Sequence, residues 1–173
     1  MKIYNKTISV DTVAGRVSYH NITEQVKAFL DETGVKIGNV LIQSPHTTCS
    51  VMFEEFVHDT DYNGDEYLQV DLDRILDKII PRELTEKMDY KYPGPKHEAF
   101  MFELGKKNPS YPPELSSILN GDAHLRASFM GNSKSFIIDE GKIQIGTVGY
   151  IYFVDFDQNR ERQRTCHIQI IGE

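Results

Sequence analysis

The chain of 173 residues lacks long apolar runs and contains only two cysteines. No stretch reaches the roughly 20 apolar residues that a membrane-spanning helix needs, and residues 1–6 lack the apolar core of a secretory signal. Cys49 and Cys166 are too few for a disulfide framework and have no metal-ligand spacing, so we interpret both as reduced core residues. We therefore expect a cytoplasmic protein with no membrane partner.

Positive charge is also scarce, because 19 Lys and Arg residues stand against 26 Asp and Glu residues and give a net charge of −7. Proteins that bind nucleic acid through its phosphates rely on clustered basic residues, so this balance argues against a nucleic-acid partner. One basic run, Arg-Glu-Arg-Gln-Arg, occupies residues 160–164. We interpret it as a solvated hairpin, and a local anion-binding patch is the alternative.

The remaining composition is that of a globular protein, with 39% hydrophobic and 26% charged residues. The length is close to that of one ordinary domain and allows a sizeable core. The chain has no internal repeat and no composition shift typical of a linker. These features predict a single domain over residues 1–173.

Hydrophobic periodicity predicts strands at both ends of the chain and helices between them. The predicted helices occupy residues 21–34, 66–80 and 117–130. Five of the seven prolines lie between residues 88 and 113, which indicates a long ordered loop. Strands are predicted at residues 2–10, 16–20, 38–44, 48–53, 135–138, 143–147, 150–156 and 165–171. This order predicts an α+β fold with antiparallel sheets.

The strongest helix signal lies at residues 66–80, where Pro81 marks the end of the helix. Its apolar side chains recur at helical spacing and predict the buried face: Leu68, Leu72, Ile75, Leu76 and Ile79. The charged side chains between them are interpreted as the solvated face rather than as a carboxylate site: Asp71, Asp73, Asp77 and Lys78.

Two histidine motifs, His46-Thr47-Thr48 and Asp122-Ala123-His124-Leu125, are the main candidates for a polar site. Each lies where an extended apolar segment adjoins small polar residues. A half-buried imidazole needs a partner for each ring nitrogen, and the neighbouring hydroxyls and carboxylate could supply them. The sequence predicts that the two motifs meet in one solvent-reachable cavity.

Two other kinds of chemistry are open to these histidines. A transition metal is the first, because His46, His97 and His124, with Asp122 or Glu55, would suit Zn²⁺ in an open site of three protein ligands and water. The chain has no H-x-x-x-H pattern, so these ligands would have to converge from separate segments. A cysteine nucleophile is the poorest fit, since Cys49 is flanked by residues typical of a strand interior.

Several short motifs follow one another in order along the chain: His46-Thr47-Thr48, Glu55, Ile79-Ile80-Pro81, residues 122–128, Gly131-x-Ser133, residues 141–147, Asp155-Phe156-Asp157, Arg160-x-Arg162 and Gly172-Glu173. This ordered set resembles the YjbQ family, and the resemblance covers nearly the whole chain. It implies an α+β fold of two packed, mainly antiparallel β-sheets with two to three helices. It also implies assembly as a homotrimer.

The resemblance further implies a weak thiamine phosphate synthase activity, which is a transferase reaction that expels pyrophosphate. The implied pocket binds a phosphorylated small molecule, with Mg²⁺ held through Glu55 or Asp122. We predict catalytic roles for His46, Glu55, Asp122 and His124. We predict ligand contacts from Thr47, Thr48, Arg126, Ser128 and Ser133. His97 is a looser match to the family pattern.

One departure from the family pattern bears on these expectations. Where many members read Gly-Thr-Trp-Gln, this chain reads Gly146-Thr147-Val148-Gly149. A site that has lost an aromatic and an amide side chain could bind without turning its ligand over. A non-catalytic ligand- or metal-binding protein is therefore the first alternative function, and a metal-dependent hydrolase that uses the same pocket is the second.

Overall fold

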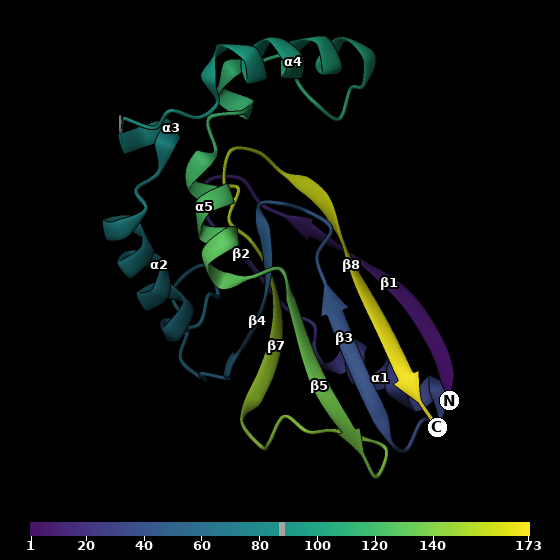
Figure 1. Ribbon diagram of the computed structural model, residues 1–173. Helices are drawn as coiled ribbons and strands as arrows, with labels where there is room; N and C mark the ends of the chain where they lie inside the picture. Colours follow the sequence, from purple (N-terminus) through teal and green to yellow (C-terminus); the bar gives the residue numbers. More distant parts are fainter. Residues whose placement is uncertain (87–88) are drawn as a thin grey trace.

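The computed structural model describes residues 1–86 and 89–173 (Figure 1). Its strands are β1 (Lys2–Thr12), β2 (Ser18–Asn21), β3 (Gly38–Gln43), β4 (Cys49–Glu55), β5 (Ser133–Asp139), β6 (Lys142–Ile143), β7 (Gly149–Asp155) and β8 (Arg162–Gly172). Its helices are α1 (Thr23–Thr33), α2 (Tyr67–Ile79), α3 (Glu83–Glu86), α4 (Gly94–Lys107) and α5 (Gly121–Met130), with a 3-10 turn at Leu115–Ser117.

The strands form two antiparallel sheets, which confirms the predicted α+β class. The larger sheet has the order β1-β8-β3-β5-β6, and the smaller sheet has the order β2-β7-β4. The two longest strands, β1 and β8, pair along their whole length, from Lys2 opposite Gly172 to Thr12 opposite Arg162. The first and last strands of the chain are therefore neighbours in one sheet.

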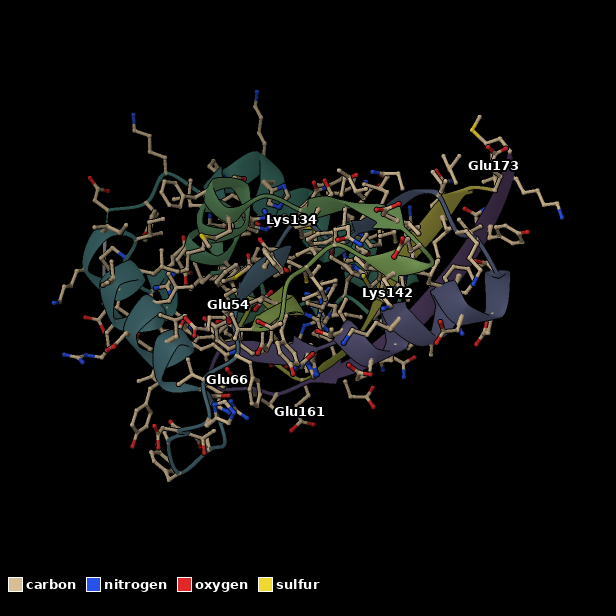
Figure 2. All side chains as sticks on the ribbon, turned by 90° about the horizontal axis from the view of Figure 1, so that it is seen from below. Glu54, Glu66, Lys134, Lys142, Glu161 and Glu173 are labelled. Atoms are coloured by element: carbon tan, nitrogen blue, oxygen red, sulfur yellow. The ribbon has the colours of Figure 1, made fainter. Side chains whose placement is uncertain are left out.

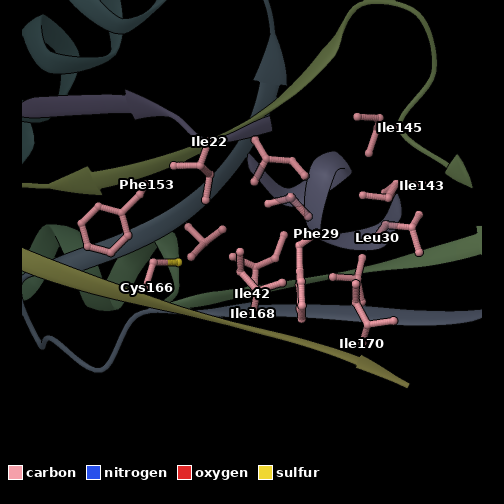
Figure 3. Close-up of a cluster of buried hydrophobic side chains, with 14 of the residues drawn as sticks. Ile22, Phe29, Leu30, Ile42, Ile143, Ile145, Phe153, Cys166, Ile168 and Ile170 are labelled. Carbon is pink, nitrogen blue, oxygen red and sulfur yellow. The ribbon is translucent and has the colours of Figure 1, made fainter. Parts of the chain in front are cut away.

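The main hydrophobic core lies between the two sheets, and α1 closes one side of it (Figure 3). Because side chains alternate along a strand, every second residue of β8 points into this core. Ile168 and Ile170 face Phe153 of β7 and the α1 side chains Phe29 and Leu30 in the same cluster. Helix α1 ends at Gly34, whose φ of 69° is the left-handed cap conformation that glycine favours.

The smaller sheet is the central layer of the molecule. Its strand β7 is buried continuously from Ile151 to Asp155, as expected for a strand covered on both faces. Tyr152 and Val154 point away from the sheet interface and pack in a second cluster, which includes Leu76 of α2 and Ala127 of α5. Figure 1 shows α2 and α5 together on this side of the strands.

The number of helices is larger than predicted. The described residues form five α-helices, and the segment interpreted as a long loop contains the 14-residue helix α4. Its prolines do not interrupt it, because Pro95 lies in the first turn, where a missing N–H is tolerated. Met88, the first residue of the predicted loop, lies outside the described residues. No helix among those described combines the length and apolar character that a membrane crossing requires.

The predicted strand at 143–147 is also shorter than expected, since β6 ends at Ile143. Asp139 pairs with Lys142, so the turn from β5 to β6 contains only Glu140 and Gly141. Both residues have positive φ, 49° and 73°. A two-residue hairpin turn needs positive φ at both positions if its twist is to match that of the flanking strands.

Helix α2 packs differently from the prediction. Of the apolar stripe, only Leu76 is fully buried, whereas Leu68, Ile75 and Ile79 are 43%, 56% and 60% exposed. On the side interpreted as solvated, Asp71 and Lys78 are exposed as predicted, whereas Asp73 and Asp77 make polar contacts with the rest of the fold. The Tyr19 hydroxyl donates to Asp73 Oδ1 at 2.8 Å, so this carboxylate lies between α2 and β2.

Further carboxylates line the same contact between α2 and the smaller sheet. Glu66 forms a capping box with Gln69 at the start of α2, and the Tyr152 hydroxyl donates to Glu66 Oε1 at 2.6 Å. Gln69 Nε2 also donates to Glu54 Oε1 at 3.0 Å. Figure 2 shows Glu54 and Glu66 on the side of the molecule where α2 lies. Much of the polar attachment of α2 therefore depends on acidic side chains that have little access to water.

The substitution Asp73→Asn tests this attachment. Burial raises the pKa of Asp73 from its ordinary value of 3.8 to about 6, so the folded state binds this proton more tightly than the unfolded state. The resulting stabilisation is present below pH 4 and is lost as the pH rises through about 6. Asp73→Asn should therefore raise the free energy of unfolding at pH 7.5 by roughly 1–3 kcal/mol and have little effect at pH 4.

Urea unfolding of both proteins at the two pH values measures this difference. Asp71→Asn is the matched control on the same helix, because Asp71 is exposed and pairs with its neighbour Arg74. A lower stability of Asp73→Asn than of wild type at pH 7.5 would show that the ionised carboxylate is the preferred state of this contact.

Candidate functional site

A cavity of about 370 Å³ lies at the end of the sheets where β3 ends and β8 begins. Its floor comes from the link between β3 and β4 and from the segment that joins β7 to β8. Its walls come from the start of α5 and from the segment around α4. Figure 1 shows α4 beyond this end of the strands. The cavity is therefore built by segments that are distant in the sequence.

Both histidine motifs contribute to this cavity, as the sequence predicts. His46, Thr47 and Thr48 line it from the β3–β4 link, and His124 lines it from α5. His97, on α4, also lines it. The three histidines are half-buried, so each ring is within reach of solvent and of a ligand.

The two predicted carboxylates do not line the cavity. Glu55 is exposed at the far end of β4, six residues from Cys49 at the cavity end, which is a separation of about 20 Å at the rise of a strand. Asp122 is only 5% exposed, and its Oδ1 accepts a hydrogen bond from the Glu83 backbone N–H at 3.3 Å. The described structure therefore does not bring these two acids to the cavity with the histidines.

Three predicted ligand contacts also lie elsewhere. Arg126 is fully buried and donates to Asp77 Oδ1 at 2.6 Å and to the Ile80 carbonyl oxygen at 2.7 Å, so it fixes the end of α2 to α5. Ser128 lines a neighbouring hollow of about 470 Å³, which it shares with His46 and Thr47. Ser133 begins β5 and is not among the residues that line the cavity.

The basic run lines the cavity, which corrects its interpretation as a solvated hairpin. Arg160, Arg162 and Arg164 all contribute, whereas the residues between them are exposed. Arg162 and Arg164 are two apart on β8 and so share one face of the strand, and Arg160 reaches the same cavity from the bend before β8. This alternation, read together with the strand predicted at residues 165–171, is the signal that could have identified the arginines from the sequence.

Two of these arginines are paired with buried carboxylates. Arg164 Nε donates to Asp155 Oδ2 at 2.7 Å, and Arg162 forms an ion pair with Asp157. Arg160 is different, because its only protein hydrogen bond in the described structure goes to the Ser110 carbonyl oxygen, at 2.9 Å. Its Nε is buried without a partner, and burial together with the charge of Arg162 lowers the pKa of Arg160 from its ordinary value.

Asp155 is a positioning residue that the site prediction did not include. Its carboxylate is completely buried beneath the cavity. Oδ1 accepts hydrogen bonds from the Thr48 hydroxyl at 3.1 Å and from the Asp157 backbone N–H at 3.0 Å, while Oδ2 binds Arg164. One side chain therefore ties the first histidine motif to the arginine segment.

His46 has a fixed hydrogen-bonding role. Pairing between β3 and β8 ends where Gln43 lies opposite His167. Beyond this end, the backbone N–H of Thr165 on β8 donates a hydrogen bond to His46 Nε2 at 3.0 Å. The neutral ring therefore carries its proton on Nδ1. Burial and the charge of Arg164 lower the pKa of His46, which favours this neutral form.

This role does not fit metal ligation. The lone pair of His46 Nε2 already accepts a backbone hydrogen bond, and among the described residues no three His, Cys, Asp or Glu side chains are grouped as a ligand set. The predicted Zn²⁺ set of His46, His97 and His124 is therefore not formed. Glu55 and Asp122 do not fit a Mg²⁺ site in the cavity either.

A cysteine nucleophile does not fit the structure either. Cys49 is fully buried, and this burial raises the pKa of its thiol well above its usual range. The thiolate, which is the reactive form, is therefore suppressed at neutral pH. Cys166 is buried as well, and burial raises its pKa to about 12. Both cysteines are core residues, as predicted from the sequence.

On the opposite wall, the Tyr92 hydroxyl lies between two of the histidines. It is 3.3 Å from His97 Nε2, 3.5 Å from His124 Nε2 and 3.3 Å from Asn120 Oδ1. Asn120 Nδ2 in turn donates to Asp157 Oδ2 at 2.7 Å. A continuous chain of polar contacts therefore connects the arginine segment to His124. Neither Tyr92 nor Asn120 stands out in the sequence, because their roles depend on this tertiary contact.

The fold is that of a small α+β protein whose cavity is lined by histidines and arginines. The sequence profile of the family described as "UPF0047 protein YjbQ-like" matches residues 6–173, and the chain belongs to this family. It is 30% identical to the UPF0047 protein YugU of Bacillus subtilis, over 96% of this chain and 98% of the relative.

Solved structures show the same fold. A YjbQ/UPF0047 family protein from Clostridium acetobutylicum is 28% identical and superposes with a TM-score of 0.64, covering 95% of this chain and 99% of that one. A protein from Sulfolobus solfataricus, described as YbjQ-like and of unknown function, is 23% identical with a TM-score of 0.67, covering 99% and 100% of the two chains. The second likeness concerns the fold alone.

The departure from the family's Gly-Thr-Trp-Gln pattern lies away from the cavity. Gly149 pairs with Glu55 at the far end of β4 and β7. A Cβ atom added at Gly149 would lie only 2.4 Å from the ring of Phe53, so a side chain at this position has no room beside that phenylalanine. The loss of the Trp-Gln pair therefore does not alter the lining of the histidine cavity.

Asp155→Asn tests whether this carboxylate organises the cavity. The substitution keeps the shape of the side chain but leaves the largely buried Arg164 guanidinium without its counter-charge. Removing one partner of such a pair should lower the free energy of unfolding by roughly 3 kcal/mol. Chemical denaturation measures the change. Glu103→Gln, which removes the exposed ion pair with Lys106, is the control and should change stability by less than about 1 kcal/mol.

Proposed function

We propose that the cavity binds a phosphorylated small molecule through its arginine side and its histidine side. The observation that carries this proposal is Arg160, a half-buried cation at the cavity with no carboxylate bound to it in the described structure and an unpartnered Nε. A buried guanidinium without its hydrogen bonds is costly, and an oxyanion supplies both the charge and the acceptors.

The local charge balance supports an anion as the ligand. Three arginines line the cavity, and the carboxylates of Asp155 and Asp157 each compensate one of them. One positive charge is left over in a chain whose net charge is −7. The excess positive charge is therefore confined to the cavity, which favours a small anion over an extended polyanion.

The remaining lining gives the cavity the size and polarity of a metabolite site. A volume of about 370 Å³ lies in the range of small-molecule pockets. Met101 and Ile118 add apolar surface beside the polar groups. A ligand with a phosphate at one end and a less polar body at the other would match both surfaces.

Arg160→Ala tests the binding proposal. Wild-type protein should gain thermal stability with inorganic phosphate and more with pyrophosphate, relative to chloride at the same ionic strength. Loss of the Arg160 guanidinium should weaken this affinity by about tenfold or more, because a charge-assisted hydrogen bond contributes roughly 1.5–3 kcal/mol.

Thermal-shift titrations give the apparent affinities. Arg74→Ala is the matched control, since Arg74 is an exposed arginine whose ion pair is with Asp71 on α2. Equal anion affinity in the Arg160 and Arg74 variants, or no stabilisation of wild type by either anion, would contradict the proposal.

The resemblance to the YjbQ family extends the proposal to a reaction, namely thiamine phosphate synthase-type transfer. Its pyrophosphate product carries the kind of charge that the row of arginines can hold. The observation that favours the alternative, binding without turnover, is the position of Glu55 and Asp122, because both acids predicted to assist the reaction lie outside the cavity.

A growth test separates the two functions. If the chain is a transferase, its overexpression should rescue a bacterial strain that requires thiamine because it lacks this synthase, and the Arg160→Ala variant should not rescue it. Growth on added thiamine is the positive control. Absence of rescue by well-expressed wild-type protein that binds pyrophosphate would assign the cavity to binding alone. The homotrimer and the cytoplasmic location stay predictions.

A further inference from the structure

The hydrogen-bond directions on the Tyr92 side of the cavity follow from Asp157. A carboxylate only accepts, so the Asn120 group that faces Asp157 Oδ2 at 2.7 Å is the amide nitrogen. The amide oxygen of Asn120 therefore faces Tyr92. The Tyr92 hydroxyl has a single proton, and it donates this proton to Asn120 Oδ1 at 3.3 Å.

Once that proton is committed, the Tyr92 oxygen offers only lone pairs to its two histidine neighbours. Burial raises the pKa of Tyr92, so the hydroxyl remains protonated at neutral pH and cannot act as a phenolate. His97 and His124 each approach it through Nε2. Each can bond to it only when that nitrogen carries a proton.

The Thr47 backbone is a second hydrogen-bond partner of the His124 ring. A hydrogen bond with the Thr47 backbone favours the charged form of His124, and a bond of that sign is one that the ring donates. The imidazolium has two N–H groups, and the Tyr92 oxygen and the Thr47 carbonyl are two acceptors beside it. The neutral ring can satisfy only one of them.

The charges around His124 come from every element packed against it. Burial lowers the pKa of His124, and the neighbouring His97 on α4 also lowers it, while Asp157 and Asp122 raise it. Glu83 of α3 contacts the start of α5 at Gly121. His46 and the arginines face it across the cavity: Arg160, Arg162 and Arg164. A bound dianion would place negative charge beside the ring and so favour the imidazolium against the burial and the His97 charge that lower its pKa.

We propose that Tyr92 fixes His124 as the proton-binding group of the anion site, so that the cavity takes up a proton when an oxyanion enters. His46 does not share this role, because Thr165 holds its Nε2 as an acceptor. This inference rests on the proposed function, since it requires an anion to bind. It adds a positioning residue, Tyr92, and assigns different roles to the two histidine motifs.

Sulfate is the probe that tests the proposal, because it stays a dianion throughout the range of the experiment and does not itself take up protons. Calorimetric titration with sulfate at one pH, in two buffers of different ionisation enthalpy, measures the protons taken up by the protein. For wild type we expect proton uptake near pH 7. We also expect a dissociation constant that rises with pH by up to about tenfold per unit.

Three variants test whether His124 binds the proton that is taken up with sulfate. His124→Gln should bind sulfate with no pH dependence and no proton uptake. Tyr92→Phe should retain binding at low pH but take up fewer protons at pH 7, because the imidazolium loses one acceptor. Tyr90→Phe is the matched control and should behave as wild type, since the Tyr90 hydroxyl donates to the Pro81 carbonyl oxygen, outside the cavity. Thermal unfolding of each variant confirms that it is folded.

The possible failures are distinguishable. Sulfate binding without proton uptake by wild type would overturn the role of His124 and leave the anion site intact. Proton uptake that persists in His124→Gln would also overturn it. Absence of sulfate binding at every pH, with the protein folded, would instead remove the proposed function on which the inference rests.

Discussion

The cavity depends on one buried carboxylate, that of Asp155. It lies at the end of β7, and its two oxygens hold Thr48 from the β3–β4 link and Arg164 from β8. It also accepts the backbone N–H of Asp157, which in turn pairs with Arg162. A charge in the interior must be compensated where it lies, so this carboxylate fixes the positions of the segments that supply its partners.

The layered fold explains why such a carboxylate can exist. The smaller sheet is covered on one face by the larger sheet and on the other by α2 and α5, so the end of β7 is surrounded by protein. Only at the end of the strands does the chain leave this core, and there the polar residues collect. The arginines and Asp157 form one side of the cavity, and Tyr92 with His124 forms the other. Asn120 connects the two sides through its amide.

Local patterns in the sequence were good predictors of the elements and poor predictors of their partners. The end of α1 at Gly34 and the alternation along β1 follow from backbone preferences that act over a few residues. The apolar stripe of α2 has equally clear periodicity, yet Ile75 and Ile79 remain exposed. Periodicity identifies a face that can be buried, but the neighbouring elements decide whether it is covered in a single chain.

The sequence alone determined the α+β class, most strands, the principal helices and the two histidine motifs that line one cavity. These depend on side-chain spacing and on short motifs. Tertiary structure decided which polar residues join those histidines, placing Arg160 and Tyr92 beside them and Glu55 about 20 Å away along β4. The reason is that a hydrogen bond or an ion pair depends on distance in space, and strand pairing sets that distance between residues far apart in the chain.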